Sequence, residues 1–292
     1  MRTSRKIWML LLLAACGQQT GAPADTGAAA ADSARLAEVL GAQSEEQQAR
    51  YAFRHPQETL EFLGIAPGMT VVEVLPGAGW YSKILLAYLG QDGLLIGADY
   101  SFEMVEKLGF LKGEGLAARK RWVETWTQEA ESWRGAGAAP VSAFVLGSMP
   151  EAVAGTADAV LFIRALHNLN RVEAEGGYLT AALADAQRGL EPGGILGVVQ
   201  HEARSDTPDA WADGSNGYLK RDALIARLEQ AGFEYLGATE VNANPKDRPN
   251  EDEFVWRLPP SLSTSRDDPT RRAQLQAIGE SNRMTLKFRK PE

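Results

Sequence analysis

Two histidines follow short apolar runs that are typical of buried strands, and this position makes both candidate bases. His167 is paired with Asn168, and the second histidine is His201. Ligands of open α/β sheets bind beyond the carboxyl ends of the strands, so both imidazoles are expected at a binding site. Histidine titrates near neutral pH and suits proton transfer, while Asn168 and Tyr218 would orient the group that loses the proton.

Each of these residues also has a purely structural explanation. His167 with Asn168 suits the turn after a strand, and His201 with Glu202 suits a polar pair in a loop. No set of His, Cys, Asp or Glu residues has metal-ligand spacing, so we expect no metal site. The chain lacks a Gly-x-Ser-x-Gly elbow and has a single cysteine, so neither feature supports an acyl-transfer enzyme.

The stretch VVEVLPGAGWYS, residues 71–82, indicates a turn that binds a ligand. A strand containing Glu73 leads into Gly77 and Gly79, and a helix is expected to follow. Glycines let the backbone approach a ligand, and the helix N-terminus offers unpaired N–H groups. The next strand ends at Asp99, where an acid accepts hydrogen bonds from ribose in Rossmann-like folds. These features fit a ligand with a ribose, which S-adenosylmethionine and NAD share.

Packing alone would also explain some of these residues. Gly77 and Gly79 suit a tight strand–helix contact, and Asp99 suits the N-cap of a helix expected from Ser101. These alternatives stay open at the level of sequence.

The elements that position these residues alternate along the chain. Strands are expected at 70–75, 94–99, 141–146, 157–163, 194–200, 234–241 and 284–289, and helices at 80–89, 101–107, 114–133, 173–190 and 221–231. Two earlier helices should start at a capping box beginning with Ser44 and at Pro56. The alternation predicts an α/β fold, a Rossmann-like doubly wound sheet of seven mostly parallel strands with helices on both faces. The alternating C-terminal segment predicts an added antiparallel strand.

Over roughly residues 45–240 the chain resembles class I S-adenosylmethionine-dependent methyltransferases. The matching pieces are Glu73-x-x-x-Gly77-x-Gly79, Asp99, the loop Gly147 to Pro150, the strand Asp158 to Ile163, and Leu190-x-Pro-Gly-Gly-x-Leu196. Pro76 to Ser82, Ala165 to Asn168, Gly217 to Leu219 and the C-terminal residues 284–290 resemble an exported group of predicted bacterial methyltransferases. One departure is Leu75, which stands where the superfamily motif has glycine.

The resemblance implies S-adenosylmethionine as cofactor and assigns roles by position. Residues of the turn would hold its methionine half: Glu73, Pro76, Gly77, Gly79 and Tyr81. Asp99 would bind the ribose, and Tyr100, Ser148 and Met149 would border the adenine. Arg164 would lie at the mouth of the fourth strand. Ser148 also suits an ordinary turn before a proline.

The first residues resemble a bacterial lipoprotein signal. Basic residues precede a short apolar run, which ends in Leu-Ala-Ala-Cys16. The resemblance implies a signal peptide at 1–15, a lipid anchor at Cys16, a flexible tether at 16–43 and a methyltransferase-like domain at 44–292. Gly17 rather than Asp follows Cys16, which favours the outer membrane, facing the periplasm. An ordinary secretory leader with a chance cysteine is the alternative.

The net charge of −8 and the lack of a long basic cluster argue against nucleic acid as a partner. We therefore expect an exported methyltransferase that acts on a small-molecule or envelope-associated acceptor and meets the membrane only through its anchor. The alternative is a non-catalytic periplasmic binding protein that retains the fold and an adenosyl-type pocket. A nicotinamide-dependent oxidoreductase is a weaker third hypothesis, because no hydride-transfer site is identifiable.

Overall fold

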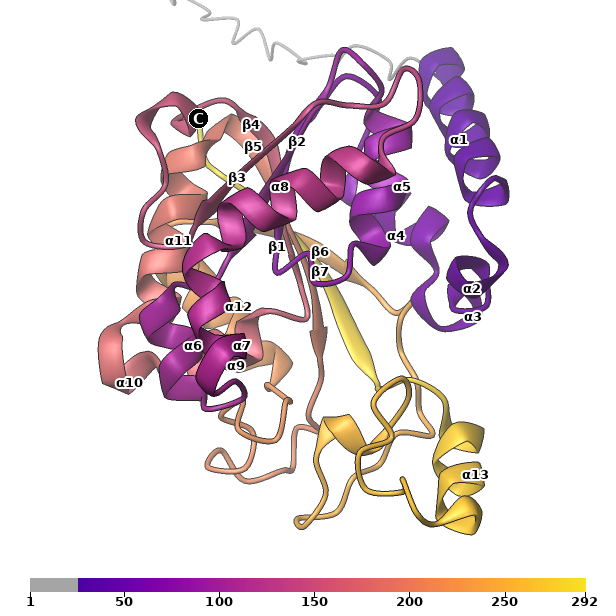
Figure 1. Cartoon of the computed structure of the whole chain (residues 1–292), viewed down its shortest axis with the longest axis vertical. Coiled ribbons are helices and arrows are strands. Elements are labelled where there is room, and N and C mark those ends of the chain that lie inside the picture. Colours follow the sequence, from indigo (N-terminus) through magenta and orange to yellow (C-terminus); the bar gives the residue numbers. More distant parts are fainter. Residues whose placement is uncertain (1–25) are drawn as a thin grey trace, which may run out of the picture.

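The computed structural model describes residues 26–292, in which seven strands form one sheet (Figure 1). The strand order is β3-β2-β1-β4-β5-β7-β6. The strands are β1 (Thr70–Val74), β2 (Leu94–Asp99), β3 (Val141–Val145), β4 (Ala157–Ile163), β5 (Leu190–His201), β6 (Glu234–Thr239) and β7 (Arg283–Arg289). Only β7 runs antiparallel to its neighbours, which are β5 and β6. The predicted mostly parallel α/β sheet with an antiparallel C-terminal strand is therefore confirmed.

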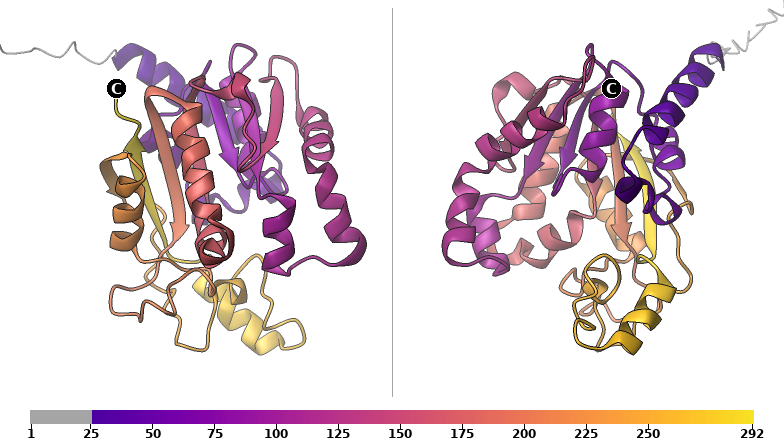
Figure 2. Two further views of the ribbon diagram at one scale, coloured as in Figure 1. Left: turned by 90° about the vertical axis from the view of Figure 1, so that its left-hand side faces the viewer. Right: turned by 45° about the vertical axis from the view of Figure 1, so that its right-hand side comes forward.

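Helices cover both faces of the sheet because successive side chains of a strand point to opposite sides. On β1, Val71 packs on one face, whereas Val72 and Val74 pack on the other. The face of Val71 is covered by α1 (Thr26–Gly41), α4 (Pro56–Leu63), α5 (Trp80–Leu89) and α8 (Trp122–Trp133). The opposite face is covered by α6 (Phe102–Leu108), α9 (Leu166–Arg171), α11 (Tyr178–Gly189) and α12 (Arg221–Gln230), and Figure 2 shows the two layers.

Several helix ends follow from local sequence. The Ser44 side chain accepts a hydrogen bond from the Gln47 N–H and starts α2 (Glu45–Gln48), as the capping box predicts. Pro56 begins α4, after the short α3 (Tyr51–Arg54). Ser101 caps α6 through the Met104 N–H, so the proposed helix cap at Asp99 is wrong.

The long helix expected at 114–133 is interrupted by a 3-10 turn. It consists of α7 (Gly113–Ala118), a 3-10 turn η1 (Arg119–Arg121), and α8. The reason is packing, because α7 buries no residue while α8 buries Trp122 and Trp126 against the sheet. The Trp126 ring lies 2.6 Å from where a Cβ of Gly97 would stand, so β2 needs glycine there. The helix expected at 173–190 is likewise split into α10 (Glu173–Gly176) and α11.

The predicted tether at 16–43 is wrong for residues 26–41, while residues 16–25 and the predicted signal peptide at 1–15 lie outside the described residues. Residues Thr26–Gly41 form α1, and Leu36 and Leu40 are buried against α4 and α5. Leucines four residues apart lie on one helix face, which explains why this Ala-rich stretch docks on the domain. Within residues 26–292, no helix is both long enough and apolar enough to cross a bilayer.

The carboxyl ends of the parallel strands, here called the carboxyl edge, are covered by two long segments. Residues 202–220 and 242–282 form this edge cap, which lies below the sheet in Figure 1. The edge cap contains η3 (Val255–Arg257) and α13 (Pro269–Ile278), neither of which was expected from the sequence. A further 3-10 turn, η2 (Glu151–Val153), follows β3.

Candidate functional site

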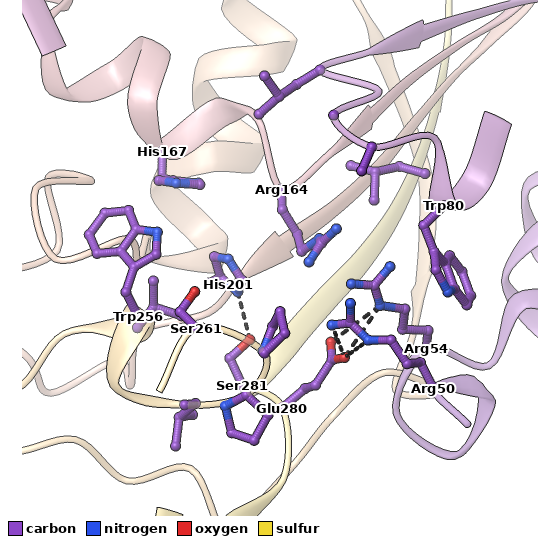
Figure 3. A pocket seen from close by; sticks show the side chains of 18 of the residues that line it. Arg50, Arg54, Trp80, Arg164, His167, His201, Trp256, Ser261, Glu280 and Ser281 are labelled. Atoms are coloured by element: carbon purple, nitrogen blue, oxygen red, sulfur yellow. Dashed lines mark hydrogen bonds and ion pairs between the residues drawn. The ribbon is translucent and has the colours of Figure 1, made fainter. Parts of the chain in front are cut away.

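A cavity of about 360 Å³ lies between the carboxyl edge and the edge cap (Figure 3). Its walls come from four parts of the chain: the segment around α3, the turn after β1, the ends of β4 and β5, and the edge cap. The lining residues are Arg50, Arg54, Leu75, Pro76, Gly77, Ala78, Trp80, Ile163, Arg164, His167, Asn168, His201, Val255, Trp256, Leu258, Pro259, Pro260, Ser261, Glu280 and Ser281. The carboxyl edge is where open α/β sheets bind their ligands.

Two non-glycine residues that line the cavity adopt left-handed backbone conformations. Leu75 has a φ of 57° just after β1, and Arg164 has a φ of 58° just after the adjacent β4. Such residues cost about 1–3 kcal/mol each and cluster at functional sites. Leu75 therefore takes a conformation that glycine would favour, and its partly buried side chain packs against the core.

The two glycines of the turn do different work. Gly77 is exposed in the cavity wall, and a Cβ added there would meet nothing closer than the Leu75 carbonyl oxygen at 4.0 Å. Gly79 is buried, and a Cβ there would stand 2.2 Å from the Trp133 ring. Gly77 thus leaves its backbone open to a ligand, whereas Gly79 serves packing.

Glu73 does not line the cavity. Its side chain is 3% exposed, faces α5 and accepts a 2.6 Å hydrogen bond from the Ser82 hydroxyl. Burial raises the pKa of Glu73 to about 7, although the Ser82 hydroxyl and the Arg164 charge oppose that shift. Glu73 therefore does not point to where it could contact the methionine half of the cofactor directly, as the sequence predicted. Tyr81 also points away, since its hydroxyl donates to the Arg54 carbonyl oxygen at 3.3 Å.

Asp99 lies beside the turn but outside the cavity. The Leu75 N–H donates to the Ala98 carbonyl oxygen, which brings the ends of β1 and β2 together. The Asp99 carboxylate accepts from the Tyr100 N–H at 2.6 Å and pairs with Arg119 at 2.9 Å. Burial raises the pKa of Asp99, and the Arg119 guanidinium works against that shift. Asp99, which the sequence predicted to bind a ribose, is thus paired with Arg119 in this structure.

The residues expected around adenine lie apart from the cavity. The buried Tyr100 hydroxyl donates to the Ala165 carbonyl oxygen at 2.7 Å. Met149 is buried in the core against α11, and its sulfur lies 3.1 Å from where a Cβ of Gly189 would stand. Ser148 is exposed in the turn after β3. The structure therefore does not bring these three side chains to the cavity.

The two candidate bases do meet at the cavity. The rings of His167 and His201 have centroids 5.3 Å apart, and Nδ1 of His201 lies 2.6 Å from the Ser281 hydroxyl oxygen. Burial lowers the pKa of His167 to about 4, with the Arg164 charge adding to the effect. Burial and the His167 ring hold the pKa of His201 well below its usual range. Both imidazoles are therefore neutral at neutral pH and able to accept a proton. Asn168 lines the same wall.

Tyr218 was expected to orient an acceptor, and the structure contradicts this. The side chain is fully buried within the edge cap, where its hydroxyl donates to Asp247 at 2.9 Å and accepts from Arg257 at 3.0 Å. Asp247 and Arg257 also form a buried ion pair at 2.7 Å. Tyr218 completes this network, so it holds the edge cap together and does not touch the cavity.

Sequence reasoning missed a cluster of arginines around one acid. Glu280 pairs with Arg283 at 2.6 Å and with Arg50, and it lies 3.4 Å from Nε of Arg54. Figure 3 shows Arg164 reaching from the end of β4 toward these groups. The one available signal was the four-residue spacing of Arg50 and Arg54, which places two cations on one side of a helical turn.

These charges perturb one another strongly. Burial, together with the neighbouring Arg164 charge, lowers the pKa of Arg54 to about 8. Burial also lowers the pKa of Arg164 to about 10, with Arg283 adding to the effect. Burial raises the pKa of Glu280, but the Arg283, Arg54 and Arg50 charges lower it by more, so Glu280 stays ionised.

Within residues 26–292, no group of three or more His, Cys, Asp or Glu side chains is arranged to hold a metal ion.

No model of a known protein family matches the sequence, and no curated protein matches it. Solved structures do share its fold. The geranyl diphosphate C-methyltransferase of Streptomyces coelicolor A3(2), solved with S-adenosyl-L-homocysteine, is 13% identical over 87% of this chain and 87% of that chain, with a TM-score of 0.51. A chain of the complex between the Haloferax volcanii Trm112 methyltransferase activator and a protein described as a methyltransferase is 14% identical, with a TM-score of 0.50 over 89% of this chain and 98% of that chain.

The TM-score of 0.51 to the first of these structures reflects a shared fold. At this identity the likeness concerns the fold. The chain has the Rossmann-like fold of the S-adenosylmethionine-dependent methyltransferases.

Proposed function

We propose that this protein transfers a methyl group from S-adenosylmethionine to a small or envelope-associated acceptor held in the cavity. The observation that carries the proposal is that the open glycine turn at Gly77 shares one cavity with the neutral imidazoles of His167 and His201. The methyltransferase fold supports the same reaction class.

The residues present fit an adenosyl cofactor at the turn. Gly77 exposes backbone to the cavity, and α5 begins beside it with no side-chain cap from the described residues, so N–H groups remain for a carboxylate. Asp99 lies next to this turn and would bind a ribose once Arg119 releases it. When bound, S-adenosylmethionine supplies a methyl carbon activated by the attached sulfonium.

The chain's own contribution is alignment and proton transfer. The cavity would hold the acceptor at the end of the β1 turn, since displacement at carbon depends on proximity and orientation. His201 would accept the acceptor's proton at Nε2 if its Nδ1–H donates to the Ser281 hydroxyl oxygen, 2.6 Å away. A strongly lowered pKa makes these imidazoles weak bases, which favours an acceptor that is acidic or already ionised.

Calorimetric titration of the purified full chain with S-adenosylhomocysteine and, separately, NAD tests the proposal. We expect micromolar affinity for the first and none for NAD. In a Gly77→Val variant the side chain would enter the cavity and strain a backbone with a φ of 57°, so affinity should fall at least tenfold. A Gly155→Val change is the matched control, since Gly155 also has a positive φ with open space around it and lies outside the cavity. No affinity for S-adenosylhomocysteine would contradict the proposed function.

We further propose that the domain is exported and anchored to the outer membrane through a lipid on Cys16, facing the periplasm. The support is the lipoprotein-like segment of the sequence, and Cys16 lies outside the described residues. A Cys16→Ser variant that still partitions into membranes after processing would contradict the anchor.

A further inference from the structure

Arg54 and Arg164 are cations in the cavity wall that the protein leaves incompletely paired. Within the described residues, neither Nη1 of Arg54 nor Nε of Arg164 has a hydrogen-bond partner, although both atoms are buried. Buried polar groups are nearly always hydrogen-bonded, and an unsatisfied buried charged group destabilises a fold. The two atoms therefore indicate a group that the protein itself does not supply.

The one acid in the cavity wall is largely committed to other partners. Glu280 receives its close contacts from Arg283 and Arg50, while Arg54 reaches it only at 3.4 Å through Nε. The Arg54 guanidinium lies over the Trp80 ring, 4.4 Å from its centroid, and this contact holds the arginine in place. Trp80 thus orients Arg54 and leaves Nη1 unpaired.

The charge of the cavity is opposite to that of the protein. Three guanidiniums and one carboxylate line it, from Arg50, Arg54, Arg164 and Glu280, which gives a net charge of +2 in a chain of net charge −8. A positive cavity in an acidic protein concentrates anions. Guanidiniums bind carboxylate and phosphate oxygens through two hydrogen bonds at once, so an oxyanion would satisfy the unpaired atoms.

We propose that the methyl acceptor is a small molecule with a carboxylate or phosphate group, which Arg54 and Arg164 bind. This inference rests on the proposed function, because it assigns the anion to the acceptor. Trp256 also lines the cavity and provides apolar surface for the rest of the molecule. The volume of about 360 Å³ restricts the acceptor to a small compound or to the end of a larger one.

The competing occupant is the carboxylate of the cofactor's methionine half, since the same cavity includes Gly77. The two assignments differ in competition. If the arginines bind the acceptor, an anion and S-adenosylhomocysteine bind together. If they bind the cofactor's carboxylate, the two exclude each other.

The test is calorimetric titration of the full chain with benzoate, inorganic phosphate and the neutral benzamide, each with and without saturating S-adenosylhomocysteine. We expect benzoate or phosphate to bind, benzamide to bind at least tenfold more weakly, and S-adenosylhomocysteine to leave anion affinity unchanged. Stronger benzoate binding identifies a carboxylate acceptor, and stronger phosphate binding identifies a phosphate acceptor. Competition between the bound anion and S-adenosylhomocysteine would overturn the proposal. So would a failure of both anions to bind, or equal binding of benzoate and benzamide in a chain that does not bind phosphate.

Variants locate the site. Arg164→Gln should weaken anion binding at least tenfold, and Arg164→Lys should restore part of it because the charge returns. Arg266→Gln, an exposed arginine of the edge cap, is the matched control and should bind like the unaltered chain. Circular dichroism of each variant shows whether it is folded. If an anion binds but S-adenosylhomocysteine does not, the proposed function is contradicted while the anion site remains supported. Failure of the proposed function can therefore be distinguished from failure of the anion-site proposal.

Discussion

Nδ1 of His201 lies 2.6 Å from the hydroxyl oxygen of Ser281, although 80 residues separate them in the chain. His201 ends β5 and Ser281 belongs to the edge cap, so the docking of the edge cap on the sheet creates this pair. If Nδ1–H of His201 donates to the Ser281 hydroxyl oxygen, Nε2 keeps a free lone pair and His201 can act as a base.

Nitrogen-15 NMR of the histidine rings measures that tautomer directly. We expect His201 to be neutral across pH 6–8, because its pKa is held well below the usual range. We also expect the neutral ring to carry its proton on Nδ1, where it is donated to the Ser281 hydroxyl oxygen. A Ser281→Ala change removes the acceptor and should shift the population toward the Nε2–H form. A dominant Nε2–H tautomer in the unaltered protein would rule out Nε2 of His201 as the base.

Glu73 and His167 should make opposite contributions to the pH dependence of stability. The pKa of Glu73 rises from 4.5 to about 7 on folding, so the unfolded chain releases its proton first and stability falls as pH rises through this range. The pKa of His167 falls from 6.5 to about 4, so the unfolded chain gains a proton first and stability falls as pH drops from 6.5. Each contribution is on the order of 2 kcal/mol between about pH 5 and 8.

Urea denaturation at several pH values tests this pair. Compared with the unaltered protein, Glu73→Gln should gain relative stability as pH rises from 5 to 8, and His167→Gln should lose it. Because each variant is compared with the same reference at each pH, the other titrating groups cancel. Parallel curves for either variant and the unaltered protein would show that the residue does not titrate as its burial demands.

Arg119 should compete with the cofactor for Asp99. Its guanidinium pairs with the Asp99 carboxylate at 2.9 Å, where a ribose would bind. An Arg119→Gln change should therefore increase the affinity for S-adenosylhomocysteine several-fold, whereas Asp99→Asn should reduce it at least tenfold. Arg121→Gln, which removes an exposed pair with Glu124, is the control and should leave affinity unchanged. Unchanged affinity in the Asp99 variant would refute the ribose assignment.

Leu36 should stabilise the domain although it lies in the stretch expected to be a tether. Its side chain is fully buried between α1 and the helices beneath it. Leu36→Ala should lower the free energy of unfolding by about 2–4 kcal/mol, as in other cores, while Glu38→Ala on the exposed side should change it by less than about 0.5 kcal/mol. Equal effects of the two changes in urea denaturation would mean that α1 is not docked in solution.

The layered sheet was predictable because its signals are local. Short apolar runs specified strands buried on both faces, and α5 and β4 have the predicted bounds, Trp80–Leu89 and Ala157–Ile163. The sequence also marked the turn at Gly77 and both histidines at the carboxyl ends of strands. In all of these the sequence neighbours of a residue determine its conformation.

The composition of the cavity depended on contacts between distant residues. Arg54 and Glu280 are 226 residues apart, and no spacing in the chain announces that they meet. The same reason explains the corrections, since Tyr218 is bound by Asp247 and Arg257, and Arg119 reaches back to Asp99. The sequence by itself determined the strands, helices and glycine turn through local periodicity and backbone preference. Only the tertiary structure decided which side chains face the cavity and which ones the fold keeps for its own ion pairs and hydrogen bonds, because those partners converge only when the edge cap packs on the sheet.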